Sequence, residues 1–290
     1  MKILHVAVFS PISTNIWQAD AFEELGNEVV RYDFRQRIHD LEGRIRKVNP
    51  KRDEELISLC KTEKPDMVLY SKCNKMNIKV VEEHNKTGAT TILWFMDTKT
   101  YINKELILKM KECDYVFCSS WDGINAAKKH NQNVYRLQGG YNPKVHYPMS
   151  VPKIRDVAFI GQMRGHRNRY RRFVEFEVIN GVYNEDHSRT VSETKINLSF
   201  SEGNGISNRI YKLLAAKGFV LTNPWHRMEE DFTVGKDFQI FRNPNELKHW
   251  IKYYLENEEE RKEIAEYGYK TVQNYDNINY ARRIIEVVNG

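Results

Sequence analysis

Short apolar runs rich in β-branched residues alternate with longer segments of helical periodicity through most of the chain. Runs that are apolar almost throughout, separated by helices, are typical of a parallel sheet covered on both faces. In the first half, the pattern predicts strands at Ile3–Phe9, Glu28–Phe34, Asp66–Ser71, Thr90–Met96, Tyr115–Ser119 and Asn133–Leu137. Helices are predicted between them at Trp17–Leu25, Asp53–Lys61, Lys75–Asn85, Lys104–Cys113 and Asp122–Lys129. The fold class is therefore α/β.

The alternation stops at Gly139–Pro152, where three prolines and two glycines predict an interdomain linker. A second alternation follows. Its strands are predicted at Asp156–Ile160, Phe176–Ile179, Ile196–Phe200, Phe219–Thr222 and Phe238–Phe241, and its helices at Asn168–Phe173, at Ser207–Lys217 and from Pro244 onward. We expect two doubly wound, Rossmann-like domains, at 1–145 and 153–274.

Composition narrows the classes of protein that fit. The formal net charge of +6 over 290 residues suits an anionic partner but is low for a dedicated nucleic-acid binder. The four cysteines are expected to be reduced, and no His/Cys/carboxylate group has the spacing of a metal site. His84 and His130 lie in polar helical contexts and are expected to be exposed. No apolar run is long enough to span a membrane or to act as a signal peptide, so a cytoplasmic protein is expected.

The segment Ser192–Asn223 predicts an anion site. It reads as a strand, a polar loop with glycine, an amphipathic helix and another strand, and phosphates bind at such loop-to-helix junctions. Ser207 or Asn208 is expected to cap the helix. Arg209 and Lys212 lie three residues apart on one helix face and are candidate ligand contacts, with solvent exposure as the alternative. Asn223 ends the following strand, which is a usual place for ligand contacts.

A second candidate anion contact opens the second domain. The strand in VAFIGQMRGHRNRYRR ends at Gly161, which permits close backbone approach, and Arg164 follows with a guanidinium suited to phosphate oxygens. Arg164 is therefore a candidate diphosphate clamp. The alternative is a solvated basic helix face, and surface roles are expected for Arg171 and Arg172.

Asp97 is the candidate catalytic residue of the first domain. It ends the apolar run LWFMD, and packing explains a carboxylate poorly at the end of a core strand. A role as base or as orienting group for an acceptor is one interpretation. An N-cap or loop turn is the other.

The second half resembles the glycosyltransferase family 1-type domain of CgeB-like spore-maturation proteins. The matching runs are DVAFIGQMR, SETKINLSF, RIYKLLAAKGFVLTN, EEDFTVGKDFQIF, ELKHWIKYYL and ERKEIAEYGYKTV, which together cover nearly all of Asp156–Ile285. The first half is similar, more loosely, to the amino-terminal partner domain of such proteins. The resemblance implies a GT-B fold with two Rossmann-like domains facing a cleft. It also implies that the terminal helix, 275–290, crosses back to the first domain.

In function, the resemblance implies a metal-independent glycosyltransferase with a nucleoside diphosphate sugar, expected to be a UDP-sugar, held mainly by the second domain. Arg164, Arg209 and Lys212 would stabilise the diphosphate leaving group. The family places Glu where Lys212 stands, to hold the donor ribose, and the related two-glutamate motif would need an acid at Asn204. Two alternatives stay open. The net charge of +6 and the basic run Arg164–Arg172 allow a transferase acting on hydroxylated bases of DNA, and the missing glutamate at Lys212 allows a catalytically silent nucleotide-sugar-binding protein.

Overall fold

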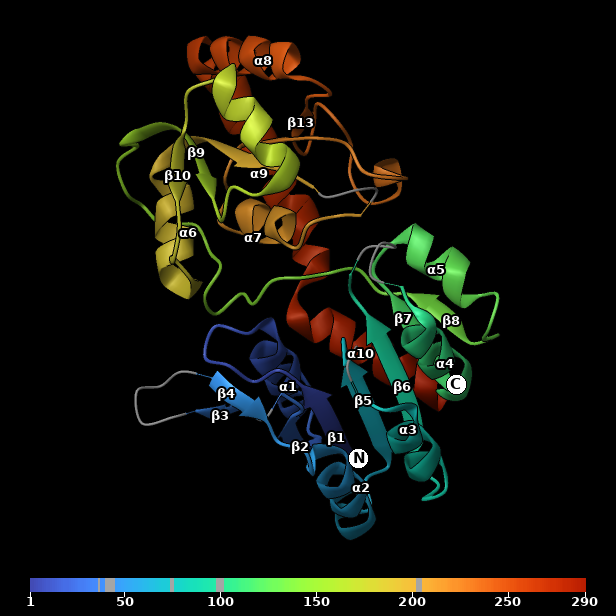
Figure 1. The fold of residues 1–290 in the computed structure, drawn as a ribbon. Coiled ribbons are helices and arrows are strands. Elements are labelled where there is room, and N and C mark those ends of the chain that lie inside the picture. The colour runs from blue at the N-terminus through green and yellow to red at the C-terminus, as the bar shows by residue number, and fades with distance from the viewer. Residues whose placement is uncertain (36, 40–44, 74–75, 98–101, 202–204) are drawn as a thin grey trace. The chain divides into compact units, whose positions relative to one another are not determined.

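The computed structural model describes residues 1–290 except 36, 40–44, 74–75, 98–101 and 202–204. The chain divides into two compact units. Unit 1 contains Met1–Gln138 and Ile278–Gly290, and unit 2 contains Gly139–Asn277. Each unit is built around a parallel sheet with helices on both faces (Figure 1).

The sheet of unit 1 has the strand order β2-β1-β5-β6-β7-β8, and its strand pairs are all parallel. Its strands are β1 (Lys2–Ala7), β2 (Glu28–Asp33), β5 (Met67–Ser71), β6 (Thr90–Phe95), β7 (Tyr115–Cys118) and β8 (Val134–Arg136). The chain leaves β1 toward β2 on one side and returns to β5 on the other. Between β2 and α2, the short antiparallel strands β3 (Arg37–His39) and β4 (Ile45–Val48) pair outside this sheet.

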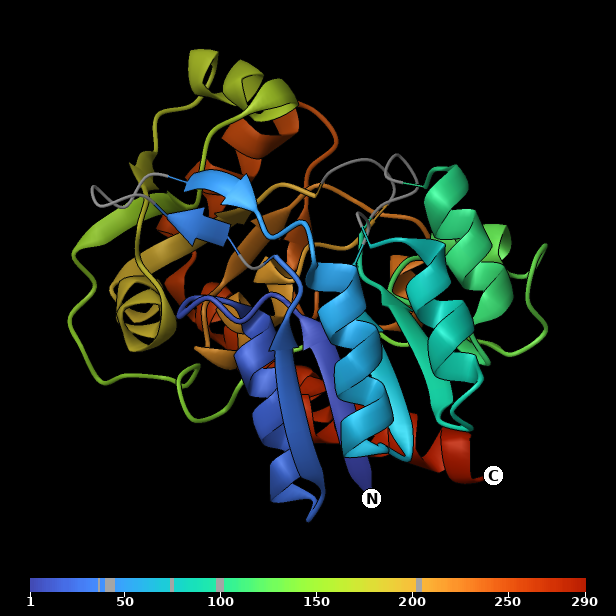
Figure 2. The ribbon, with the colours of Figure 1, turned by 60° about the horizontal axis from the view of Figure 1, so that its bottom comes forward.

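Helices cover both faces of the unit 1 sheet. The helices are α1 (Thr14–Glu24), α2 (Arg52–Glu63), α3 (Ile78–Asn85), α4 (Lys104–Glu112), α5 (Trp121–Ala127) and α10 (Asn277–Asn289). Side chains of α2 to α5 pack with Leu4 and Val6 on one face, whereas α1 and α10 pack with Ile3 on the other. The last helix therefore belongs to the core of unit 1. Figures 1 and 2 show it, in red, lying across the strands of this unit.

The sheet of unit 2 is also parallel, with the order β10-β9-β11-β12-β13. Its strands are β9 (Arg155–Ile160), β10 (Glu177–Ile179), β11 (Thr194–Ser199), β12 (Val220–Thr222) and β13 (Gln239–Ile240). Its helices are η2 (Gly165–Arg172), α6 (Asn184–Ser192), α7 (Arg209–Ala215), η3 (Met228–Glu230), α8 (Pro244–Glu256), α9 (Glu258–Val272) and η4 (Gln273–Tyr275). Helix α8 and η2 pack on one face, and α6 and α7 pack on the other. The α/β class with two parallel sheets is thus confirmed.

The proline-rich segment 139–152, expected to be a linker, is anchored along unit 2. The Val145 carbonyl accepts a hydrogen bond from the Ser188 hydroxyl at 2.8 Å, and the Met149 amide donates one to Ser192 Oγ at 3.1 Å. A Cβ at Gly139 would lie 1.8 Å from Asn208 Oδ1, so a larger residue there would have to displace the Asn208 side chain. These contacts explain why unit 2 begins at Gly139 and not after the last proline.

His84 corrects one expectation. Its side chain is fully buried, with Nδ1 2.6 Å from the Tyr70 hydroxyl and Nε2 3.2 Å from the Leu56 carbonyl oxygen. Burial lowers the pKa of His84 to about 4, so the ring is neutral at physiological pH. The four cysteines are free thiols in the core, as expected.

Candidate functional site

The strand order of unit 2 reverses between β9 and β11, because β10 lies on one side of β9 and β11 on the other. In open α/β sheets, ligands bind beyond the carboxyl ends of the strands at such a switch point. Gly161 follows β9 at this edge, and Arg209 begins the helix that follows β11. The strand topology therefore selects the edge at which the two predicted residues Gly161 and Arg209 lie.

Gly161 and Arg209 are in direct contact. Gly161 has φ +139°, and a Cβ there would lie 2.7 Å from Arg209 Nη2. Arg209 Nε donates to the Ile160 carbonyl oxygen at 2.8 Å, and its guanidinium carbon lies 4.6 Å from the centre of the Phe159 ring. The Ile160 carbonyl oxygen and the Phe159 ring hold the Arg209 guanidinium in place. Only glycine, which has no side chain, therefore fits at position 161.

Arg209 keeps one donor unused. Its Nη1 is buried and has no hydrogen-bond partner among the described residues. Burial, reinforced by the charge of Arg167, lowers the pKa of the Arg209 guanidinium to about 10, which leaves it charged at physiological pH. A buried, oriented cation with a spare donor is a strong site for an anion, because leaving such a group unpaired is costly.

Lys212 lies one helical turn further along α7, close to Arg209 and to two histidines. Burial and the charge of Arg209 lower the pKa of Lys212 to about 8. Burial and the charge of Lys212 lower the pKa of His146 to about 3, and the pKa of His187 falls well below its usual value for the same kind of reason. The two imidazole rings, 5.7 Å apart, are therefore neutral, and the charges of Lys212 and Arg209 contribute to lowering their pKa. Arg209 and Lys212 bring two positive charges close together, which favours an anionic ligand.

Arg167 is a functional candidate that sequence reasoning missed. Its guanidinium lies 5.7 Å from the Phe159 ring that also carries Arg209, and its Nη1 and Nη2 donate to the carbonyl oxygens of Gln162 and Phe200. The predicted Arg164 instead lies exposed at the start of η2, lining an open hollow of about 710 Å³ with Arg171 and Glu177. The turn of η2 thus brings Arg167, and not Arg164, beside Arg209. In the sequence, only the run of basic residues at Arg164–Arg172 indicated a role for Arg167.

The remaining residues predicted for unit 2 hold the backbone of the site. The Ser207 hydroxyl accepts from the Arg209 amide at 3.3 Å, and Asn208 is the N-cap residue of α7 without a side-chain capping bond. Asn223 accepts from the Ser201 amide at 2.7 Å and donates to the Ser201 carbonyl oxygen at 3.2 Å. Its amide thus fixes the chain after β11. Asn204 lies outside the described residues.

In unit 1, Asp97 follows β6 and forms an ion pair with Lys72 Nζ at 2.8 Å. About a quarter of its side chain is exposed. A buried polar network lies near the carboxyl ends of the paired strands β1 and β5, with His5 Nε2 2.9 Å from Ser71 Oγ and Ser71 Oγ 3.2 Å from Gln18 Oε1. The sequence did not reveal this network, because its members come from three separate elements.

The described residues contain no group of three or more His, Cys, Asp or Glu side chains that could hold a metal ion. Among the same residues, no helix has both the length and the apolar character needed to cross a membrane.

Comparison with known proteins relates the second half of the chain to a family. Residues 148–289 match the family described as "Glycosyl transferase-like". No curated protein matches the sequence.

Solved structures match over the whole chain. The chain is similar to Anabaena Alr3699/HepE in complex with UDP-glucose, with a TM-score of 0.74, 10% identity and coverage of 100% of this chain and 99% of that one. It is also similar to the sucrose-phosphate synthase tll1590 from Thermosynechococcus elongatus, with a TM-score of 0.73, 10% identity and coverage of 100% and 98%. The apo lipopolysaccharide outer core galactosyltransferase WaaB matches with a TM-score of 0.64, 13% identity and coverage of 100% and 99%. These likenesses show the GT-B fold.

Proposed function

We propose that this GT-B glycosyltransferase, whose residues 148–289 match the glycosyl transferase-like family, transfers a sugar from a UDP-sugar to an acceptor hydroxyl. The structures of HepE with UDP-glucose and with UDP support this class of donor. The observation that carries the proposal is Arg209, a buried cation with an unused donor at the switch point of unit 2.

The chemistry needs positive charge at the diphosphate. In the transfer, the bond between sugar C1 and the β-phosphate oxygen breaks, the acceptor oxygen bonds to C1, and the acceptor hydroxyl loses its proton. The leaving diphosphate gains negative charge, which preorganised cations stabilise. We assign this role to Arg209 and Lys212, with Arg167 beside Arg209 and the exposed Arg164 as further phosphate contacts. Because these residues supply the charge, the proposed mechanism needs no metal ion.

Lys212 replaces the glutamate that the resemblance implies for the donor ribose. A protonated lysine only donates hydrogen bonds, whereas a carboxylate accepts them from ribose hydroxyls. Arg209 lies close enough to Lys212 for its charge to lower the pKa of Lys212. Because two neighbouring cations match the negative charge of a diphosphate, Lys212 suits the diphosphate better than the ribose. We therefore propose that donor recognition in this chain depends more on the diphosphate than on the ribose.

The other predicted residues receive supporting roles. Gly161 leaves room for the Arg209 guanidinium, and Ser207 and Asn208 set the start of α7. Asn223 holds Ser201 at the end of β11. Asp97, a partly exposed carboxylate paired with Lys72, is proposed to orient the acceptor hydroxyl or to take its proton.

The test is release of nucleoside diphosphate by the full chain from a panel of UDP-glucose, UDP-galactose, UDP-N-acetylglucosamine and GDP-mannose, with water as the acceptor of the sugar. We expect release of UDP from at least one UDP-sugar, at a rate that falls at least tenfold in Arg209→Met. Binding of UDP without release from any donor would identify a silent nucleotide-sugar-binding protein. Absence of both binding and release would refute the proposed function.

A further inference from the structure

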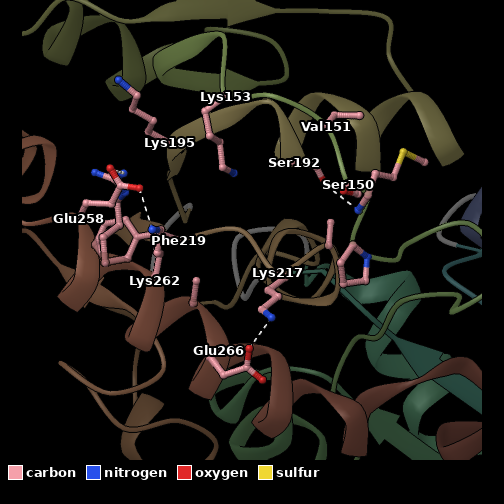
Figure 3. A pocket seen from close by; sticks show the side chains of 15 residues that line it. Ser150, Val151, Lys153, Ser192, Lys195, Lys217, Phe219, Glu258, Lys262 and Glu266 are labelled. Carbon is pink, nitrogen blue, oxygen red and sulfur yellow. Dashed lines mark hydrogen bonds and ion pairs between the residues drawn. The ribbon is translucent and has the colours of Figure 1, made fainter.

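A pocket of about 390 Å³ lies at the opposite edge of the unit 2 sheet from Arg209 (Figure 3). It is lined by residues that precede β9, begin β11 and precede β12, together with the first turns of α9. Arg209 begins α7, whereas Ala216 in the pocket follows the last residue of that helix. A helix of seven residues is about 10 Å long, so a ligand in this pocket does not touch Arg209.

The lining carries more positive than negative charge. Five cationic side chains and two carboxylates line it. The carboxylates are already paired, Glu266 with Lys217 and Glu258 with Lys262 at 2.8 Å. Lys195 points away from the hollow in Figure 3 and pairs with Asp156 at 2.7 Å. The positive charge left facing the pocket comes from Lys153 and Arg261.

Lys153 and Arg261 are held in place without a strong counter-charge. Lys153 Nζ donates to the Thr194 carbonyl oxygen at 2.9 Å, which leaves two of its three N–H groups for other partners. No carboxylate lies within ion-pair distance of Lys153 in the part of the chain that the structure describes. Arg261 is buried, donates to the Tyr254 carbonyl oxygen, and is 3.8 Å from Glu258. Lys153 is exposed at the mouth of the pocket. Partial desolvation and the charge of Arg261 nevertheless lower the pKa of Lys153 to about 8, as expected for two cations that face each other.

Apart from Ser150 and Ser192, the other walls are apolar. Phe219, Val151, Met149, Ala216 and Ala265 line the pocket beside the two cations. A pocket of a few hundred Å³ with apolar walls and a few convergent charged groups is typical of a small-molecule site. The arrangement therefore selects a molecule with an anionic head and an apolar body.

We propose that this pocket is a second binding site, separate from the donor site, for a small molecule that carries a phosphate or carboxylate on an apolar body. Lys153 and Arg261 bind the anionic group, and Phe219 with its apolar neighbours contacts the body. Nothing in this assignment depends on the proposed transferase activity.

The experiment titrates the full chain with phenyl phosphate, benzoate and phenol, using calorimetry. We expect phenyl phosphate or benzoate to bind, and the tighter of the two identifies the anionic group. Phenol, which has the same ring without the anion, is expected to bind at least tenfold more weakly. Equal binding of phenol, or no binding of either anion at about 10 mM, would overturn the proposal.

Three variants locate the binding. Lys153→Met is expected to weaken the anion at least tenfold, whereas Lys195→Met, which removes a lining cation that points outward, changes affinity less than twofold. Arg209→Met is expected to leave this binding intact, so a failure of the donor site is distinguishable from a failure of this pocket. Loss of binding in Arg209→Met but not in Lys153→Met would overturn the assignment. Thermal midpoints of the variants show whether each is folded.

A proton balance gives an independent readout. The pKa of Lys153 is lowered to about 8, so this side chain is only partly protonated at pH 8. A bound anion raises the pKa toward its usual value, and Lys153 therefore takes up a proton when the anion binds at pH 8. The binding heat is therefore expected to depend on the ionisation enthalpy of the buffer in wild type, and not in Lys153→Met. The same buffer dependence in both proteins would contradict the role of Lys153.

Discussion

Replacement of Lys212 by methionine is expected to weaken UDP binding at pH 7 and to remove most of its dependence on pH. Methionine keeps the length and much of the apolar stem of lysine but carries no charge. The pKa of Lys212 in the unliganded protein is lowered to about 8, by burial and by Arg209. The side chain is thus mostly protonated at pH 7 and mostly neutral at pH 9. A diphosphate beside it favours the protonated form, so UDP affinity falls as the pH rises through 8.

The size of the effect follows from the charged hydrogen bond that the Lys212 ammonium donates to the diphosphate and that methionine cannot make. One hydrogen bond to a charged group contributes about 1.5–3 kcal/mol, which corresponds to about a 10- to 150-fold change in Kd. Above the pKa, wild-type affinity is expected to fall by up to about tenfold per pH unit until it meets that of the variant. The terminal phosphate of UDP, with a second pKa of about 6, is ionised throughout this range and does not produce the trend.

The lowered pKa of Lys212 also affects the stability of the folded protein. The pKa of Lys212 is about 8 when folded and about 10.5 when unfolded, so the folded state binds the proton less tightly. The resulting cost to folding is fully present below pH 8 and disappears as the pH rises toward 10.5. Lys212→Met is therefore expected to raise the thermal midpoint at pH 7, and to raise it less at pH 10.

Calorimetric titration of UDP at pH 7, 8 and 9 tests this prediction, with Lys248→Met as an exposed control on α8. The control is expected to follow wild type at each pH. If Lys212→Met binds UDP as tightly as wild type at pH 7, or keeps the full pH dependence, the assignment of Lys212 to the diphosphate is wrong. Tighter binding by Lys212→Glu than by wild type would favour a ribose contact at this position instead.

Three further predictions address other residues of the site. Gly161→Ala and Gly181→Ala both place a side chain at positive φ, which strains the backbone by about 1–3 kcal/mol in each variant, but only a Cβ at 161 meets Arg209. Gly161→Ala is therefore expected to lose more UDP affinity than Gly181→Ala. Equal losses in the two variants would argue against the contact between Gly161 and Arg209. Asp97→Asn is expected to leave UDP binding unchanged while transfer to an acceptor falls about 10²- to 10⁴-fold, and an unchanged transfer rate would exclude Asp97 as base. Arg164→Ala is expected to weaken UDP binding, and an unaltered Kd would remove Arg164 from the phosphate contacts.

The alternation of apolar runs and helical patterns was enough to predict the two parallel sheets, because buried parallel strands carry apolar side chains on both faces. It was not enough for the hairpin of Arg37–His39 and Ile45–Val48, whose polar sequence has no such signal. His84 shows a different limit. Its burial depends on Tyr70 and on the Leu56 carbonyl, which reach it from other elements.

Within the site, the sequence identified Arg209 and Lys212 from their spacing on one helix. It favoured Arg164 and passed over Arg167, because only the path of η2 decides which of them reaches the Phe159 ring. The role of Asn223 was equally hidden, since its amide bonds to Ser201 through a pairing of two strand ends that only the folded chain brings together.

The most direct test of the central claim is the affinity of UDP for the full chain, measured by calorimetry for wild type, Arg209→Met and Arg172→Met. Arg172 is an exposed arginine of the same unit and serves as the matched control. We predict that wild type and Arg172→Met bind UDP alike. Arg209→Met, which loses the buried guanidinium with its unused Nη1, is predicted to bind at least tenfold more weakly while remaining folded. Equal binding by all three folded proteins would contradict the claim that UDP is held at this edge of unit 2.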